Sequence, residues 1–260
     1  MWKYFALLLI GLASALSFLY FRVGVPKIYR EPALATTPLH FYDNPQKPIS
    51  RINVTAVYFV PSDKQTEQID NWRELLEENL SKLQKFHELQ FQGYSRLTYK
   101  IYEQPIIGEK ESIFYDTDNT NKGNPEALRT TAAEIEKRLL SAGGDLWNDK
   151  FSSQLPEADY QPLIILYEGV GASGAVGEPA VLISRRYFTE LEYQQENTTT
   201  LAHEFYHTLG IPDGYQEKIQ EGYGLQIEKL TTSDIMGLGR QGPLERTYLG
   251  SQTLQRFGLE

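Results

Sequence analysis

The sequence predicts an α/β (α+β) domain built on a twisted, mostly parallel sheet with one antiparallel edge strand. Strand-like and helix-like segments alternate along most of the chain, which is the order of a parallel sheet whose strands are joined by helices. The last two strand-like segments follow each other without a helix between them. A connection of that kind predicts an antiparallel pair.

The first half of the domain is predicted to contain two strands with a long helix between them. Ile52–Val60 is β-branched and alternates in polarity, which predicts a strand that ends at Pro61. Between about Thr66 and Gln92, apolar residues recur at intervals of three and four, the spacing of one helical face. Arg96–Glu103 has the pattern of a second strand.

The second half continues the alternation. Residues 109–124 are polar and predict a surface loop, and the pair Asn124-Pro125 predicts the start of a helix that runs to about Ser141. The continuous apolar run Pro162–Glu168 predicts a strand that is buried on both faces. Ala180–Phe188 predicts the next strand, which we place antiparallel at the edge of the sheet.

Composition limits the kinds of site and partner. The 260 residues include no cysteine, which excludes disulfides, thiolate nucleophiles and thiolate-bound metals, so any metal must be bound by nitrogen and oxygen. The formal net charge is −9, and because residues 1–31 are basic, the remainder of the chain is more acidic still. Such a chain is not expected to bind nucleic acid.

The N-terminal part of the chain is predicted to precede the folded domain. Residues 1–21 contain an uncharged apolar run, Tyr4–Phe21, which predicts a signal anchor in the membrane, with a cleavable signal peptide as the alternative. Residues 22–48 are rich in proline and predict an extended spacer. The domain would then comprise residues 49–260, held on the extracytoplasmic side of the membrane, or secreted if the N-terminal segment is cleaved.

Two histidines and a glutamate on one predicted helix are the strongest functional signal. This amphipathic helix begins around Asn197 and ends at Gly210. His203 and His207 are four residues apart and therefore share a face, where both imidazoles can bind one divalent ion such as Zn²⁺. Glu204 lies beside them, and a carboxylate there can take a proton from a metal-activated water and later deliver it to a leaving amine.

A catalytic zinc site also needs a third protein ligand. Such sites have three protein ligands and one open position. Asp213 is the first choice, because Gly210 can reverse the chain after the helix and Pro212 restricts the residue that follows it. The alternative third ligands are later acidic residues: Glu217, Glu221, Glu228 and Asp234.

Two segments resemble the motifs of a known family. HEFYHTLGIPD, residues 203–213, resembles the HExxHxxGxx(H/D) signature of the metzincin zinc peptidases, and SDIMG, residues 233–237, resembles their Met-turn. Aspartate as third ligand is similar to the snapalysin-type variant. The resemblance implies a metzincin-like fold with an active-site helix and a C-terminal helix, and a zinc-dependent endopeptidase. The roles that it implies are metal ligands for His203, His207 and Asp213, general base for Glu204, and an apolar floor beneath the metal for Met236.

The expected partner is a peptide or protein substrate, bound as an extended strand along Ala180–Phe188. Two other functions stay open: a zinc amidase that acts on cell-wall peptides, and a non-catalytic peptide-binding module with a vestigial site. The presence of Glu204 favours an enzyme, because a purely structural zinc site needs no base. Candidates for stabilising the oxyanion of the reaction are Tyr215, Tyr223, Arg240 and Tyr248.

A few remaining residues have weaker assignments. Gly169–Gly174 matches GxGxxG, but a strand follows it where a nucleotide-binding motif requires a helix, so a flexible loop beside the cleft is predicted. Four basic or imidazole side chains are predicted to be surface residues: His40, His87, Arg185 and Arg186.

Overall fold

The computed structural model describes residues 50–117, 125–141, 160–176, 178–194, 196–214, 216–220, 224–228 and 233–256. The predicted anchor at residues 1–21 and the predicted spacer at residues 22–48 lie outside these ranges. Within the described part of the chain, no helix combines the length and the apolar character needed to cross a lipid bilayer.

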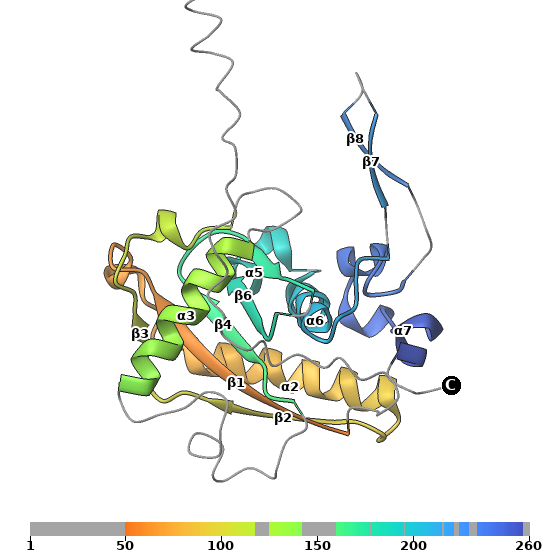
Figure 1. Ribbon diagram of the computed structural model, residues 1–260, viewed down its shortest axis with the longest axis horizontal. Coiled ribbons are helices and arrows are strands. Elements are labelled where there is room, and N and C mark those ends of the chain that lie inside the picture. The colour runs from red at the N-terminus through yellow and green to blue at the C-terminus, as the bar shows by residue number, and fades with distance from the viewer. Residues whose placement is uncertain are drawn as a thin grey trace, which may run out of the picture. The chain divides into compact units, whose positions relative to one another are not determined.

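A mostly parallel sheet forms the centre of the domain (Figure 1). β1 (Arg51–Val60) is parallel to β2 (Arg96–Ile101) on one side and to β4 (Leu163–Tyr167) on the other. The short strand β3 (Ile106–Ile107) also pairs with β1. The full order of the main path is β2-β1-β4-β6-β5, so the predicted fold class is confirmed.

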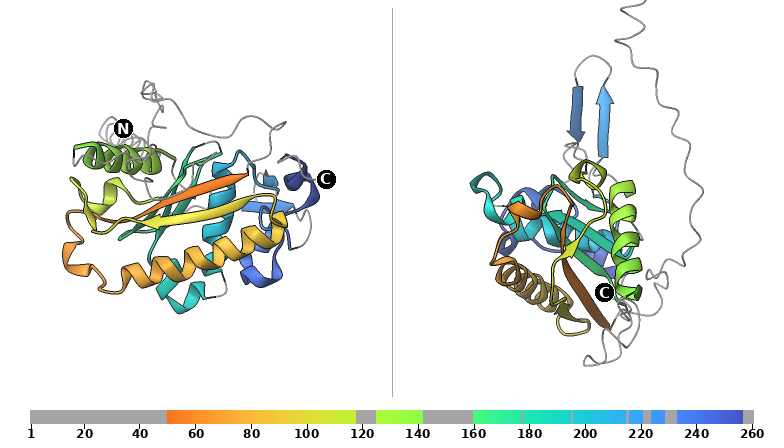
Figure 2. Two further views of the ribbon diagram at one scale, coloured as in Figure 1. Left: turned by 90° about the horizontal axis from the view of Figure 1, so that it is seen from below. Right: turned by 90° about the vertical axis from the view of Figure 1, so that its left-hand side faces the viewer.

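Helices cover both faces of this sheet. Successive residues of β1 point to opposite sides, so apolar side chains on each face pack against a helix. Val54 and Tyr58 belong to one buried cluster, which includes side chains of α2 (Trp72–Phe91) and α6 (Asn197–Thr208). Val57 and Phe59 belong to a second cluster, beneath α3 (Pro125–Ser141). Figure 2 shows the sheet between α2 and α3.

The prediction that Ala180–Phe188 is the antiparallel edge strand was wrong. β6 (Ala180–Ser184) is parallel to β4 and lies inside the sheet, and the antiparallel edge strand is β5 (Ala172–Gly174). The cause is the connection: after β4 the chain runs back along β5 and then turns into β6, which inserts between the two. β5 therefore supplies the return path that a crossover helix would otherwise provide.

The strand predicted to continue to Phe188 ends at Ser184, and a short helix, α5 (Arg186–Thr189), follows it. β7 (Gln216–Gln220) and β8 (Gly224–Glu228) pair with each other as an antiparallel hairpin. The predicted C-terminal helix is present as α7 (Ser251–Arg256). Single 3-10 turns complete the described elements: Gln65–Glu67, Ser112–Phe114, Leu191–Tyr193, Leu238–Gln241 and Leu244–Arg246.

His87 is a core residue, contrary to the prediction of a surface position. Its ring is fully buried between α2 and α6, where it stacks on Phe91 with ring centroids 4.1 Å apart. Nδ1 lies 3.2 Å from the hydroxyl of Tyr206 and Nε2 lies 2.8 Å from that of Ser95. Both ring nitrogens therefore have partners inside the core, and burial lowers the pKa of His87 to about 3.

Because the imidazole of His87 is buried in its neutral form, the folded protein is expected to lose stability against unfolding in acid. The unfolded chain binds a proton at His87 below about pH 6.5 and the folded chain does not until about pH 3, so stability falls as the pH drops through this window. The contribution is at most about 1.4 kcal/mol per pH unit. His87→Gln lacks it and is expected to show a shallower pH dependence in urea unfolding. Both proteins keep the other histidines, so identical pH dependences would contradict the prediction.

Candidate metal centre

The two histidines share one side of α6, as the spacing predicted, and this side is buried. His203 is 1% exposed and His207 is 5% exposed, and the helix is fixed in the core by Leu201 and Phe205. The helix ends at Thr208, and Gly210 follows with φ +82°, a left-handed conformation that glycine adopts without strain. The chain then reverses and brings Asp213 back to the two rings.

Three donor atoms converge at the end of this reversal. The Nε2 atoms of His203 and His207 are 3.1 Å apart, and Oδ1 of Asp213 lies 3.2 Å from the first and 3.5 Å from the second. Ligands about 2.0–2.1 Å from a tetrahedral zinc ion are separated by about 3.3–3.4 Å from one another. The triangle therefore has the edge lengths of a zinc site, and among the described residues no fourth His, Asp or Glu joins it.

Backbone carbonyls orient both imidazoles. Nδ1 of His203 lies 2.8 Å from the carbonyl oxygen of Ile235, and Nδ1 of His207 lies 2.7 Å from that of Ile211. A carbonyl only accepts, so each Nδ1 must carry the proton and donate it. The neutral rings then present the lone pair of Nε2 toward Asp213, which is the tautomer that a metal ligand requires.

The charge of the site favours a cation. Burial acts to lower the pKa of His207, but the hydrogen bond to Asp213 and the negative charges of Glu204 and Asp213 outweigh it, so this pKa is raised. Burial acts to raise the pKa of Asp213, but hydrogen bonds to His203 and His207 outweigh it and hold that pKa well below its usual range. Positive charge at the centre of the triangle is thus stabilised, and N/O donors of this type suit Zn²⁺.

Glu204 faces the sheet edge next to the triangle. Its Oε2 accepts a hydrogen bond from the backbone N–H of Gly174 in β5. The register of β5 on β6 pairs Ser173 with Leu182, so the N–H groups of Ala172 and Gly174 point away from β6 toward the free edge. One carboxylate oxygen of Glu204 is therefore fixed by the edge strand.

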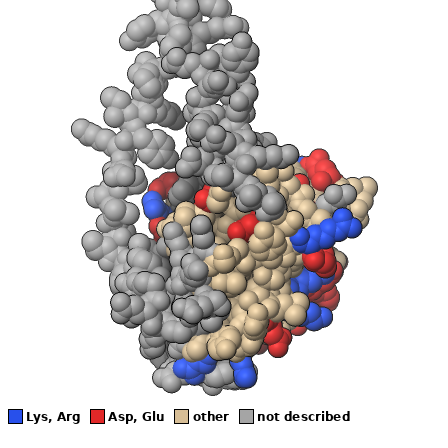
Figure 3. Space-filling view, turned by 90° about the vertical axis from the view of Figure 1, so that its right-hand side faces the viewer, with Lys and Arg blue, Asp and Glu red and all other residues tan. Residues whose placement is uncertain are grey.

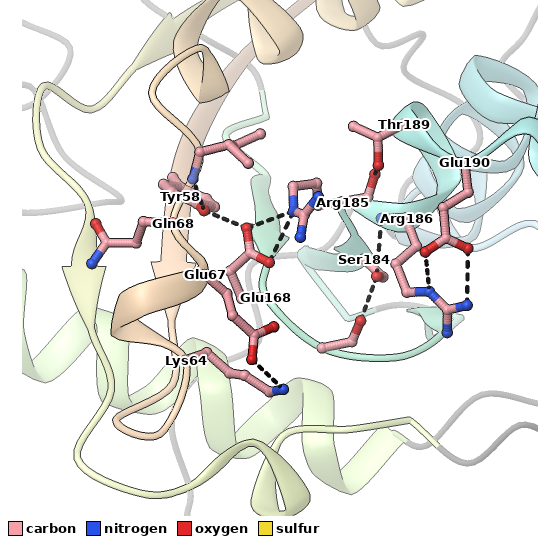
Figure 4. A network of polar contacts seen from close by, with 12 residues as sticks. Tyr58, Lys64, Glu67, Gln68, Glu168, Ser184, Arg185, Arg186, Thr189 and Glu190 are labelled. Carbon is pink, nitrogen blue, oxygen red and sulfur yellow. Dashed lines mark hydrogen bonds and ion pairs between the residues drawn. The ribbon is translucent and has the colours of Figure 1, made fainter.

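The loop before β5 is held by side chains, although a flexible loop was predicted. Oδ1 of Asp116 accepts from the N–H of Val170 at 2.8 Å, and the hydroxyl of Ser184 donates to the carbonyl of Gly169. At the start of the loop, Nε of Arg185 donates to both carboxylate oxygens of Glu168 at 2.7 and 2.9 Å (Figure 4). These contacts set the position of β5 relative to α6.

The same close-up shows that Arg185 and Arg186 each pair with a carboxylate. The side chain of Arg186 is 39% exposed and lies at the surface as predicted, whereas Arg185 pairs with a buried carboxylate. Glu168 is buried and also accepts from the hydroxyl of Tyr58. Arg186 forms a two-point contact with Glu190, at 2.6 and 2.9 Å. Their charges serve the fold at these positions.

Met236 is 2% exposed and belongs to the core cluster that contains α6. Its carbonyl accepts from the N–H of Gly214 at 2.6 Å, directly after Asp213. The turn at residues 233–237 therefore contacts the metal centre, and the role of Met236 as an apolar floor remains a prediction.

The structure separates the other candidates. Both carboxylate oxygens of Asp234 accept backbone N–H groups, so this residue is not placed as a third ligand. Glu221, Tyr215 and Tyr223 lie outside the described residues, and of Glu217 and Glu228 only the backbone is described. Arg240 is partly buried, whereas Tyr248 is exposed.

Tyr187 is a residue near the site that the sequence analysis missed. Its ring packs on that of Tyr193, with centroids 4.6 Å apart. Burial and the neighbouring Tyr193 and Glu204 raise the pKa of Tyr187 to about 12. No sequence signal marks this position, since it falls in the segment predicted as the end of a strand.

The surface on one side of the domain carries charges of both signs. In Figure 3, acidic and basic side chains alternate along one margin, and uncharged residues fill the described area between them. Isolated acidic atoms lie within this uncharged area. Over this face the described residues form no field of a single sign.

Comparisons with known proteins give structural neighbours only. No protein-family model and no curated protein matches the chain. A solved structure of catalytically inactive OgpA from Akkermansia muciniphila, in complex with an O-glycopeptide substrate, is 16% identical with a TM-score of 0.46, over 85% of this chain and 62% of that one. A zinc-dependent peptidase from Methanocorpusculum labreanum is 10% identical with a TM-score of 0.40, over 79% and 99%.

Metalloproteinase-II from Bacteroides fragilis is 14% identical with a TM-score of 0.40, over 83% of this chain and 58% of that one. The chain therefore spans less than two thirds of the length of two of these three neighbours. With TM-scores of this size, the chemistry of the metal centre has to be interpreted from this chain's own residues.

The close contact between β5 and α6 predicts that residue 174 must be glycine. A Cβ at Gly174 would lie 2.4 Å from the carbonyl oxygen of Glu204, so Gly174→Ala is expected to destabilise the protein by about 1–3 kcal/mol, measured by urea unfolding. The matched control is Gly242→Ala, where the nearest atom lies 3.7 Å from the added Cβ and the cost should stay below about 0.5 kcal/mol. Equal stabilities of the two variants would contradict this packing.

Proposed function

We propose that this protein is a zinc-dependent endopeptidase of the metzincin type, with His203, His207 and Asp213 as metal ligands. One observation carries the proposal: two buried imidazoles and one exposed carboxylate form a triangle with the edges of a tetrahedral zinc site, and Glu204 lies beside it on the helix that carries the imidazoles. When bound, Zn²⁺ would lower the pKa of water and polarise a peptide carbonyl.

Glu204 supplies the proton transfers. Its Oε2 is held by the N–H of Gly174, so the second oxygen is available to accept a proton from the attacking water. The same carboxyl group can then donate this proton to the amine that leaves.

The substrate peptide is proposed to bind along β5. β6 has strands on both sides and cannot accept a further one, so the earlier placement along Ala180–Phe188 is wrong. The outward-facing N–H and C=O of Ala172 can pair with an extended peptide, and such pairing depends little on side chains. The strand then ends at Gly174, beside Glu204, where the scissile bond has to lie.

Two further elements of the proposal come from the sequence. Residues 1–21 would anchor the protein in the membrane, with the catalytic domain on the extracytoplasmic side, or be cleaved to release it. A zinc amidase acting on cell-wall peptides would use the same residues, so parallel assays with casein and peptidoglycan separate the two substrates.

Removal of the base tests the mechanism. Glu204→Gln is expected to lower kcat for casein hydrolysis at least about 100-fold, because general acid–base catalysis is lost, while zinc content stays unchanged. Glu196→Gln makes the same change of charge at the residue that precedes this helix and should retain activity. Zinc content is measured by atomic absorption. Hydrolysis by Glu204→Gln at the wild-type rate would exclude Glu204 as the base.

Zinc affinity is expected to fall with decreasing pH. The raised pKa of His207 means that the metal-free site holds a proton, which zinc must displace. Below that pKa, each pH unit should weaken the apparent affinity about tenfold, as measured by competition with a chelator between about pH 8 and pH 5. Affinity that does not change across this range would show that neither imidazole binds the metal.

A further inference from the structure

Asp234 lies in the turn at residues 233–237 and stabilises it by accepting hydrogen bonds. Its Oδ1 accepts from the N–H of Met236 at 2.9 Å, and its Oδ2 accepts from the N–H of Gly250 at 3.2 Å. Its backbone carbonyl accepts from Gly237 at 2.9 Å and from Gly239 at 3.0 Å. This one residue therefore makes four contacts that together define the conformation of the turn.

The turn in its own right contacts the metal centre at two points. The carbonyl of Ile235 accepts from Nδ1 of His203 at 2.8 Å, which fixes the ring of the first ligand. The carbonyl of Met236 accepts from the N–H of Gly214 at 2.6 Å, which fixes the loop next to the third ligand, Asp213. Two neighbouring carbonyls thus set the distance between two ligands that are ten residues apart in sequence.

The C-terminal segment supports the turn from the other side. Ile235 donates to the carbonyl of Tyr248 at 2.9 Å, and Tyr248 donates to that of Ser233 at 3.0 Å. The adjacent residue Leu249 donates to Oε1 of Gln90 in α2 at 2.8 Å. Gly250 approaches so closely that a Cβ there would lie 2.3 Å from Oδ2 of Asp234.

We propose that Asp234 is a positioning residue of the metal centre, which joins the C-terminal segment to the turn that orients His203 and Asp213. Its carboxylate is engaged by two backbone N–H groups, so it acts through the turn and not as a ligand. Without it the carbonyls of Ile235 and Met236 lose their fixed separation, and the three donors no longer hold the edge lengths of a zinc site. Groups that orient metal ligands typically change metal affinity about 10–100-fold when they are mutated.

The test compares zinc affinity with the stability of the metal-free protein. The full chain with Asp234→Ala, which removes both acceptors, should bind Zn²⁺ at least about tenfold more weakly in a chelator competition. Asp234→Asn keeps one acceptor oxygen and should fall between Asp234→Ala and wild type. Thermal unfolding of the metal-free variants is measured in parallel.

A matched control separates positioning from a general loss of structure. Asp63 also accepts from two donors of one partner, with Oδ1 on the N–H of Ser112 at 2.7 Å and Oδ2 on its hydroxyl at 2.8 Å. It joins two loops that do not contact the donor triangle. Asp63→Ala should lower the unfolding temperature and leave zinc affinity within about twofold of wild type.

A second variant tests the same contact, between Asp234 and Gly250, if Asp234→Ala does not fold. Gly250→Ala displaces the carboxylate from the other side and should weaken zinc binding as Asp234→Asn does. Combining Asp234→Asn with Gly250→Ala should add little further loss, because both act on one interaction. Additive losses, or wild-type affinity in folded Asp234→Asn and Gly250→Ala, would overturn the inference.

This inference rests on the metal-binding part of the proposed function, and the two can fail separately. If the wild-type chain binds neither Zn²⁺ nor another divalent ion, the proposed metal centre itself is wrong. If wild type binds Zn²⁺ and the Asp234 and Gly250 variants bind it equally well, the metal centre stands and only the role of Asp234 is refuted.

Discussion

The convergence of two imidazoles and one carboxylate within a few ångströms is the constraint on which the rest of the site depends. The three donor atoms lie 3.1, 3.2 and 3.5 Å from one another. At these distances their lone pairs repel one another unless a cation or a proton lies between them. The two rings are buried, whereas Asp213 is exposed, so water reaches the carboxylate but not the imidazoles. The surrounding backbone has to hold the three groups in place.

That support comes from backbone carbonyls on both sides of the triangle. Ile211 lies three residues after the end of the helix and is a local partner of His207, whereas Ile235 comes from a separate turn and is a distant partner of His203. Carbonyls are suited to this task because their positions are set by the chain and because they accept only, which fixes the tautomer of each ring. The orientation of His203 therefore depends on tertiary structure more than that of His207 does.

The sheet contributes its free edge. Glu204 is bound by β5, and β5 is positioned by a loop whose contacts run through Asp116, Ser184 and the buried pair of Glu168 and Arg185. The proposed proton-transfer group and the proposed substrate strand thus share one element. Any displacement of that edge changes both the alignment of Glu204 and the place where an extended peptide can pair.

The sequence by itself determined the elements whose signals are local. The spacing of His203 and His207, the glycine that ends α6 and the apolar runs of β1 and β4 all predicted positions that the structure confirms, because helical and strand periodicities act over a few residues. The position of Asp213 near both rings also followed, since one chain reversal suffices to bring it back, and its role as a metal ligand remains a prediction.

Only the tertiary structure decided which elements lie side by side. β5 has only three residues, one of them a glycine, and follows another glycine, so the segment is too short for a periodic pattern and the edge of the sheet was misplaced. His87 was misjudged for a related reason, because periodicity shows which face of a helix is apolar but not that α6 will cover a polar ring beside it. The bond between Asp234 and Gly250 depends on how the C-terminal segment packs, which no local pattern specifies.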